Sequence, residues 1–216
     1  AVTVATEAID RLHSTAEAHE RVMVVEVMGR YAGWIALNAG VSSTADVVLI
    51  PEIPFDLEPV CDKIMDREAR GRRFSIVVVA EGAKPIDGKM VAKDQGAGRE
   101  VKLGGIAEQV AKEIQERTGK ETRSVVLGHL QRGGSPTTFA RLVAMRFGAA
   151  AVRMVADGNF GVMVALDPPT VNAVPLEVAT ERMKVVPGDC DTILTARDLG
   201  MCLGDEVENH RDTRTR

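Results

Sequence analysis

Three short clusters of glycine and charged residues each directly follow a predicted strand. They are Met28-Gly29-Arg30, Glu81-Gly82-Ala83, and the segment from Gly128 to Pro136, which reads Gly-His-Leu-Gln-Arg-Gly-Gly-Ser-Pro. Arginine and histidine donate hydrogen bonds that suit phosphate oxygens, and an ionised glutamate accepts hydrogen bonds from sugar hydroxyls. Glycines let the backbone approach a ligand closely, and their amides can bind an anion. The clusters therefore predict a site for a phosphorylated sugar.

The elements that carry these clusters alternate between strands and helices. The ranges 22–27 and 75–80 are almost continuously apolar and β-branched, which is typical of strands covered on both faces of a parallel sheet. Further strands are predicted at 47–50, 122–127 and 162–166, and helices at 2–12, 31–40 (ended by Gly40), 57–73, 106–118 and 137–155. This alternation predicts an α/β fold, a parallel sheet with helices on both faces. Ligands bind beyond the carboxyl ends of such strands, where all three clusters fall.

Composition excludes several other classes of protein. The chain has 216 residues, a net charge of −4 and 3% aromatic residues, so neither a basic field nor stacking platforms exist for nucleic acid or an anionic membrane. The cysteines Cys61, Cys190 and Cys202 are odd in number and lack CxxC spacing. We therefore expect no disulfide framework, no metal site and a cytoplasmic location. No apolar run suits a membrane span, and no signal peptide is recognisable.

Each residue taken alone has a simpler interpretation. An arginine or glutamate at a strand end is usually a solvated surface charge, and glycine-rich turns are common between strands and helices. His129 alone would be a packed or half-exposed histidine. The interpretation as a binding site therefore depends on all three clusters meeting at one edge of one sheet.

The three clusters, with their flanking residues, resemble the fructose 6-phosphate motifs of the 6-phosphofructokinases. The matching segments are Val25-Glu26-Val27-Met28-Gly29-Arg30, Ala80-Glu81-Gly82 and Leu127 through Pro136, in the family's order and at similar spacing. The similarity extends from about residue 1 to about residue 185. It implies phosphoryl transfer to the 1-hydroxyl of fructose 6-phosphate, which gives fructose 1,6-bisphosphate in glycolysis.

The resemblance also implies a role for each matching residue. Arg30 would be the catalytic cation that reaches the transferring phosphoryl group. Glu81 would hold sugar hydroxyls, and the 6-phosphate would be bound by cationic residues, two of them from a neighbouring subunit of a homo-oligomer (dimer or tetramer). The implied substrate-binding set is Arg21, Met28, Gly29, Arg30, Glu81, Arg123, His129, Leu130, Gln131 and Arg132, with Arg21 and Arg123 acting across the interface. Without the resemblance, these two arginines would simply solvate the starts of their strands.

The family's donor-phosphate loop and its Thr-Ile-Asp segment have no counterpart in these residues. We therefore expect the N-terminal nucleotide lobe to be largely absent, with Mg²⁺ and ATP or pyrophosphate bound mainly by that missing half, and the fragment alone to be inactive. Residues 1–130 would form the substrate-binding lobe, 131–180 a segment returning to the nucleotide lobe, and 181–216 a tail packing back on the substrate lobe. Ala83 and the stretch from Lys84 to Gly105 resemble the corresponding residues of the actinobacterial-type branch of the family, in which both ATP and pyrophosphate occur as donors.

Regulation by an effector is a further implication. Arg70 and Arg72 match positions that bind effector phosphates in bacterial members, and Asp46 matches an acidic position that meets the effector's metal. His13 stands where those enzymes have an arginine, which counts against the match. A basic helix end exposed to water is the simpler interpretation.

Two alternative functions come from other classes. One is a non-catalytic sugar phosphate sensor or regulatory subunit that kept the binding motifs without the kinase half. The other, a phosphate-binding scaffold for nucleic acid, fits poorly with the negative net charge and the scarce aromatic residues.

Overall fold

The computed structural model describes residues 1–86, 92–94, 102–103 and 105–205. These residues divide into two compact units. Unit 1 comprises Ala1–Gly133 together with the segment that begins at Val185, and unit 2 comprises Gly134–Lys184. Assigning these units to the lobes of an enzyme stays a prediction.

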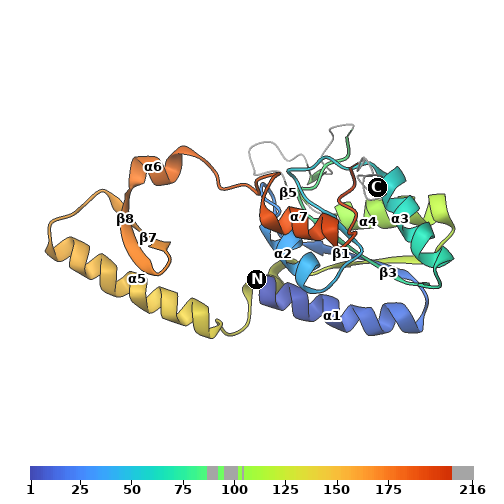
Figure 1. Ribbon diagram of the computed structural model, residues 1–216, viewed down its shortest axis with the longest axis horizontal. Coiled ribbons are helices and arrows are strands. Elements are labelled where there is room, and N and C mark those ends of the chain that lie inside the picture. Colours follow the sequence, from blue (N-terminus) through green and yellow to red (C-terminus); the bar gives the residue numbers. More distant parts are fainter. Residues whose placement is uncertain (87–91, 95–101, 104, 206–216) are drawn as a thin grey trace, which may run out of the picture. The chain divides into compact units, whose positions relative to one another are not determined.

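Unit 1 is built on the predicted alternation of strands and helices (Figure 1). Its elements are α1 (Val2–Ala18), β1 (Val22–Val27), α2 (Trp34–Ser42), β2 (Val47–Leu49), α3 (Leu57–Ala69), β3 (Ser75–Ala80), β4 (Ala92–Asp94), β5 (Lys102–Leu103), α4 (Ile106–Thr118), β6 (Thr122–Val126), the 3₁₀ helix η1 (Gly128–Arg132) and α7 (Asp191–Asp198). Four strands form a parallel sheet in the order β2-β3-β1-β6. The predicted α/β fold is thereby confirmed.

Helices cover both faces of this sheet because the strand residues alternate between two apolar clusters. In β1, Val25 and Val27 pack with α1, α2 and α7, whereas Val22 and Val24 pack with α3 and α4 (Figure 1). Every residue of β1 and β3 is buried, as expected of parallel strands between two helical layers. The core therefore holds the carboxyl ends of these strands in fixed register.

The segment that follows unit 2 packs on unit 1. The side chains of Val186, Ile193 and Leu203 are buried in the same cluster as α1 and α2. Cys202 continues this contact at the sheet edge, where its carbonyl accepts a hydrogen bond from the Val48 amide at 2.9 Å.

A buried carboxylate fastens helix α4 to the central strand. Glu26 of β1 is 3% exposed, and its Oε2 accepts hydrogen bonds from the amides of Gly105 and Ala107, each at 3.1 Å. These amides lie at the helix N-terminus, where negative charge is favourable. Glu26 is thus a structural anchor on the face opposite α1.

The predicted end of one helix differs from the structure. Helix α2 continues through Gly40 to Ser42, so the expectation that Gly40 ends it is wrong. A Cβ at Gly40 would lie 2.5 Å from a methyl of Val48, so this glycine lets α2 pack closely against β2. The stretch from Lys84 to Gly105 lies mostly outside the described residues; within it, β4 and β5 pair antiparallel.

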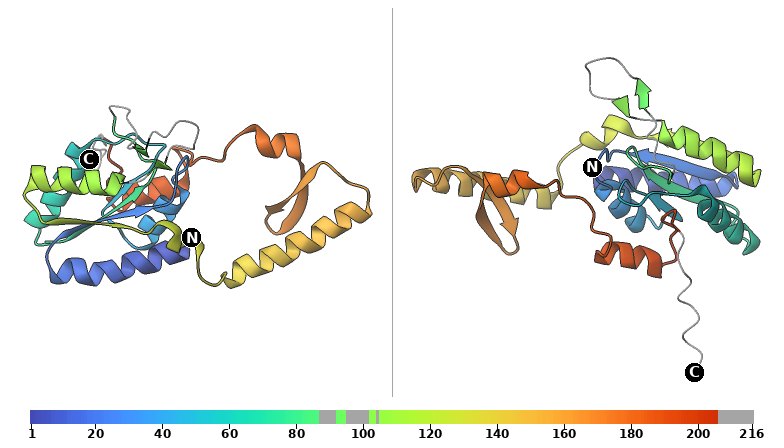
Figure 2. Two further views of the ribbon diagram at one scale, coloured as in Figure 1. Left: turned by 180° about the vertical axis from the view of Figure 1, so that it is seen from behind. Right: turned by 90° about the horizontal axis from the view of Figure 1, so that it is seen from above.

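Unit 2 contains no continuation of the parallel sheet among its described residues. It consists of α5 (Thr138–Ala156), β7 (Val162–Asp167), β8 (Thr170–Pro175) and α6 (Leu176–Glu181). Strand β7 pairs antiparallel with β8, and this hairpin packs against α5 (Figure 2). The prediction that 162–166 joins the parallel sheet is therefore wrong, because its partner is the next segment in sequence. None of the helices in the described ranges combines the length and hydropathy needed to cross a lipid bilayer.

Candidate functional site

The loops that follow β1, β3 and β6 lie side by side at the carboxyl edge of the sheet. Strand β1 lies between the other two, with Val27 opposite Ala80 and Glu26 opposite Val126. Backbone hydrogen bonds continue this pairing beyond the strands, since the Glu81 amide donates to the carbonyl of Val27 at 2.9 Å. The structure thus brings the three clusters singled out from the sequence to one edge.

Side chains from the neighbouring loops hold the backbone of the Met28-Gly29-Arg30 cluster. The Met28 amide donates to Oε1 of Gln131 at 3.2 Å, and the Gly29 amide donates to Oε1 of Glu81 at 3.4 Å. One acceptor follows β6 and the other follows β3. The loop that carries Arg30 is therefore fixed from both sides.

Gln131 is an internal support of the site. Its side chain is 1% exposed, and its Nε2 donates to the carbonyl of Gly128 at 3.1 Å while its Oε1 accepts from Met28. The same 3₁₀ helix presents His129, Leu130 and Arg132 to solvent. The helix thus has one buried anchor and an exposed surface with two groups that can bind an anion.

The side chain of Arg30 contacts the ring of its neighbour Tyr31. Its guanidinium carbon is 5.2 Å from the centroid of the Tyr31 ring, within the range of a cation–π interaction. Arg30 is half-buried, whereas Tyr31 is 56% exposed. A half-buried guanidinium at this edge interacts more strongly with developing negative charge than a fully solvated one would.

Glycine at position 82 allows the loops after β1 and β3 to touch backbone to backbone. A Cβ at Gly82 would lie 2.0 Å from the carbonyl oxygen of Arg30 and 2.9 Å from that of Gly29. Gly29 itself has φ of +151°, and a Cβ there would lie 2.9 Å from the carbonyl oxygen of Ala32. Both glycines of the motifs are therefore required by close packing.

Replacing Gly82 with alanine should displace the Arg30 backbone and destabilise the protein by about 1–3 kcal/mol, as expected for overpacking. Urea unfolding followed by circular dichroism measures this change. Gly188→Ala is the matched control, because a Cβ at Gly188 would have no neighbour within 4 Å. Equal stability of the two variants would contradict the close contact between the loops.

Arg21 and Arg123 lie at the opposite, amino edge of the sheet. Both guanidinium groups pair with Oε1 of Glu121, at 3.3 Å from Arg21 and 2.8 Å from Arg123. The Arg123 side chain is 60% exposed and that of Arg21 is 23% exposed. Glu121 thus brings two cations to one place at this edge.

The two edges are too far apart to share one small ligand. A strand rises roughly 3.3 Å per residue, so the seven steps from Arg21 to Met28 span about 23 Å. A hexose phosphate is much shorter than this separation. Within one copy of the chain, the structure therefore does not bring Arg21 and Arg123 to the other substrate residues.

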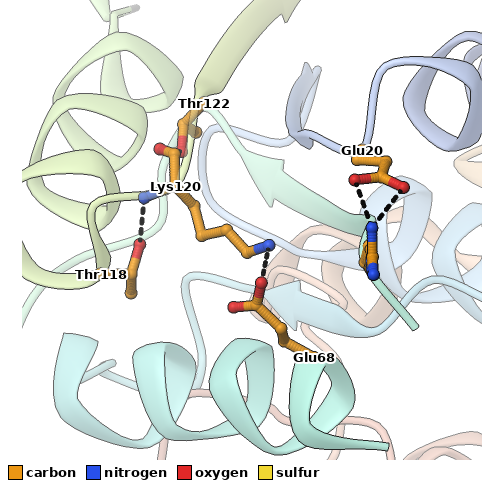
Figure 3. A network of polar contacts seen from close by, with 6 residues as sticks. Glu20, Glu68, Thr118, Lys120 and Thr122 are labelled. Carbon is orange, nitrogen blue, oxygen red and sulfur yellow. Dashed lines mark hydrogen bonds and ion pairs between the residues drawn. The ribbon is translucent and has the colours of Figure 1, made fainter. Parts of the chain in front are cut away.

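Other ion pairs make the amino edge rich in both signs of charge (Figure 3). Lys120 pairs with Glu68 of α3, and Arg73 pairs with Glu20 at 3.1 Å. The Arg73–Glu20 pair is exposed and contributes little to stability, whereas the Lys120 side chain is only 14% exposed. Arg21 and Arg123 therefore lie near other charged residues of this edge.

The expected effector residues lie apart from the carboxyl edge. Asp46 is buried, with Oδ1 2.7 Å from Arg67 and Oδ2 accepting a hydrogen bond from the Ile76 amide at 2.9 Å. Burial raises the pKa of the Asp46 carboxyl, while the Ile76 hydrogen bond and the Arg67 charge oppose that shift. A metal ion at Asp46 would have to displace Arg67.

The remaining residues of this region are partly engaged within the chain. Arg70 is exposed and pairs with Asp66 at 2.9 Å, and Arg72 is exposed. Nε2 of His13 lies 2.8 Å from the carbonyl oxygen of Ser43. The exposed arginines are thus the accessible part of this group.

The described residues contain no cluster of metal-ligating side chains. Among them, no group of three or more histidine, cysteine, aspartate or glutamate side chains could hold a metal ion. No residue of the described chain is therefore assigned to Mg²⁺.

Glu52 was not singled out from the sequence. It follows β2, and both of its carboxylate oxygens lie 3.0 Å from the amide nitrogen of Gly33, at the far end of the Arg30 loop. An acidic residue after a predicted strand is the same signal that identified Glu81. Unlike Glu81, Glu52 has no adjacent glycine, so the sequence marks it less clearly.

Comparisons with known proteins agree with this fold and these motifs. The model of the family described as phosphofructokinase matches residues 1–155. The chain is 52% identical, over 207 residues, to an ATP-dependent 6-phosphofructokinase of Chloroflexus aurantiacus, covering 96% of this chain and 57% of that protein. It is 55% identical, over 188 residues, to a pyrophosphate–fructose 6-phosphate 1-phosphotransferase of Streptomyces coelicolor, covering 86% of this chain and 55% of that protein.

A solved structure supports the same relationship. The phosphofructokinase of Pichia pastoris in the T-state superposes with a TM-score of 0.70 and 33% identity, covering 92% of this chain and 20% of that one. The chain spans little more than half the length of the curated relatives given above. Because the family match, the parallel sheet and the three motifs at its carboxyl edge agree, the chain belongs to the phosphofructokinase family.

Proposed function

We propose that this chain supplies the fructose 6-phosphate site of a 6-phosphofructokinase, which transfers a phosphoryl group to the sugar 1-hydroxyl. The observation that carries the proposal is the meeting of Arg30, Glu81 and the Gly128–Arg132 helix at one sheet edge. Relatives named for both ATP and pyrophosphate as donors support the reaction class.

The chemistry of the edge suggests a division of labour. His129 and Arg132 are exposed donors that suit the 6-phosphate, and Glu81 suits the sugar hydroxyls. Met28 and Gly29 would line the sugar, together with Leu130. Arg30 would meet the phosphoryl group in transit, where a fixed cation stabilises charge that develops in the transition state.

The amino-edge arginines would act in a second copy of the chain. By strand geometry Arg21 lies about 23 Å from Met28 at the carboxyl edge, and Arg123, which is in register with Met23, lies about 17 Å from it. Both arginines could therefore complete only a neighbour's site. Strand β6, which carries Arg123, is the last in the sheet order, and the Arg123 side chain is 60% exposed, so a partner could reach it. A homo-oligomer, dimer or tetramer, in which each copy contributes two arginines follows from the proposal.

The phosphoryl donor and Mg²⁺ would be held by the portion of the relatives that this chain does not span. Unit 2 supports this interpretation, since many of its large apolar side chains are exposed. Six of them are between 56% and 76% exposed: Phe139, Leu142, Met145, Val152, Val155 and Phe160. An apolar surface of this kind usually packs on another part of a protein. The chain alone would then bind sugar phosphate without turnover, in the cytoplasm where glycolysis takes place.

An effector anion would meet Arg70 and Arg72 at the exposed end of α3. Asp46 would take part only after losing Arg67, so an anion without a metal suits this region better. A non-catalytic sugar phosphate sensor is the second candidate function, because the chain carries the sugar phosphate motifs but spans only 57% and 55% of the two relatives given above. Assaying the protein expressed from its complete coding sequence separates the two: turnover supports the enzyme, and binding without turnover supports the sensor.

Arg132→Ala tests the proposal at a single residue. A charge-assisted contact contributes about 1.5–3 kcal/mol, so the KM for fructose 6-phosphate should rise roughly 10- to 150-fold. The control is Arg11→Ala, which removes an exposed arginine of α1. Steady-state kinetics that give both variants the KM of the parent would refute the assignment of Arg132 to the phosphate.

A further inference from the structure

The carboxylate of Glu52 links two backbone segments that are far apart in sequence. Both of its oxygens lie 3.0 Å from the amide nitrogen of Gly33, and Oε1 also accepts a hydrogen bond from the Val186 amide at 2.8 Å. Glu52 lies in the loop that follows β2, so three segments of unit 1 meet at one side chain. Hydrogen bonds to an ionised acceptor are stronger than those between neutral groups.

Each of the two donors has a defined place in the fold. Gly33 ends the loop that carries Arg30 and is the N-cap of α2. Val186 lies where the chain re-enters unit 1 after residues 134–184, and its side chain is 2% exposed in the core beside α1 and α2. Glu52 therefore joins the re-entry segment to the Arg30 loop.

The surroundings of Gly33 leave little room for another arrangement. A Cβ at Gly33 would lie 2.4 Å from Cβ of Ile50 and 2.9 Å from Oε2 of Glu52. The position is also the N-terminus of α2, where the helix dipole favours a negative charge. Close packing and electrostatics thus both hold the carboxylate against this amide.

Glu52 fixes a different part of the loop from the other acceptors. Gln131 and Glu81 hold the amides of Met28 and Gly29 at the start of the loop. Glu52 holds its end, beyond Arg30. Losing Glu52 would therefore loosen the Arg30 side of the loop while the residues that face the sugar keep their supports.

We propose that Glu52 is a positioning residue, which holds the Arg30 loop in place and couples its geometry to the segment at which the chain re-enters unit 1. This inference rests on the proposed function, because it takes Arg30 to act in phosphoryl transfer. A displacement of about 1 Å in a positioned group can lower a rate roughly 100-fold. The effect should appear in kcat, since the groups assigned to the sugar and its 6-phosphate stay in place.

Kinetics of three variants of the protein expressed from its complete coding sequence test the proposal. Glu52→Ala should lower kcat about 10- to 100-fold with the KM for fructose 6-phosphate within about threefold of the parent value. Glu52→Gln should recover most of the rate, because its amide oxygen can still accept from both amides. Asp56→Ala is the matched control: it removes a carboxylate that accepts the Glu58 amide at 2.9 Å and caps α3, and kcat should not change.

Amide hydrogen exchange gives a second readout that does not depend on activity. In Glu52→Ala, exchange should accelerate in the peptides that cover residues 28–34 and 185–188 together, and neither should change in Asp56→Ala. An unaltered kcat in Glu52→Ala, or unaltered exchange in both peptides, would overturn the proposal. If the parent protein had no phosphofructokinase activity, the proposed function would fail, and the exchange of the two peptides would still decide whether Glu52 couples them.

Discussion

Replacing Arg30 with alanine is expected to lower kcat by about 100- to 1000-fold, the usual loss when one donor to a transition state is removed. The KM for fructose 6-phosphate should change only a few fold, because the contacts assigned to the 6-phosphate and the sugar hydroxyls remain. The half-buried position of Arg30 against Tyr31 keeps the guanidinium at this edge before any donor arrives. Steady-state kinetics with saturating donor measure both parameters.

Arg30→Lys is the matched control for charge. A lysine keeps the positive charge but loses the planar fork of donors, so it should restore only part of the rate. A higher KM with the parent's kcat in Arg30→Ala would place this residue in ground-state binding instead. That result would remove the catalytic role assigned to Arg30 without affecting the sugar phosphate site.

Mixing two variants with low activity should restore activity if each site draws residues from two copies of the chain. Arg21→Ala removes a cation of the amino edge, and Arg132→Ala removes one of the carboxyl edge. In a mixed dimer both changes fall in one site and the other site is intact, so about a quarter of all sites should recover after random exchange of subunits. The expected signal is a large rise in activity above that of either variant alone.

The control for this experiment is a pair of variants from the same edge. Arg21→Ala mixed with Arg123→Ala should recover nothing, since both arginines pair with Glu121 and would enter the same neighbouring site. The exchange is carried out by dissociation and reassembly, with each variant treated alone as a reference. The size and mass of the reassembled oligomers verify that subunits have exchanged. If they have, and mixed Arg21→Ala and Arg132→Ala still show no gain in activity, the result would contradict sites shared between copies.

The sheet of unit 1 could be predicted because its strands carry their own signal. β1 and β3 are buried on both faces, and strands in that environment have nearly continuous apolar sequences, which can be recognised without the structure. The 162–166 strand has the same local pattern but pairs with β8. Pairing partners depend on contacts that local periodicity does not contain, and the role of Gly40 likewise depends on its packing against Val48.

The candidate site could be predicted in outline for a related reason. Carboxyl ends of parallel strands meet at one edge, and the order β2-β3-β1-β6 makes the residues after β1, β3 and β6 neighbours there. The internal hydrogen bonds of Gln131 and Glu52 could not be predicted, because they join side chains to amides 103 and 19 positions away in the sequence. Such bonds depend on rotamer and register.

Calorimetric titration with two probes, fructose 6-phosphate and inorganic phosphate, most directly tests whether these side chains serve one ligand. Arg132→Ala should lower the affinity for both probes, and Glu81→Ala should lower the affinity for fructose 6-phosphate only. Each loss should be roughly tenfold or more, as expected for a charge-assisted contact. Phosphate should bind Glu81→Ala as tightly as the parent or more tightly, since a nearby negative charge is gone. Unaltered affinity for fructose 6-phosphate in both variants would show that Glu81 and Arg132 do not contact a common molecule.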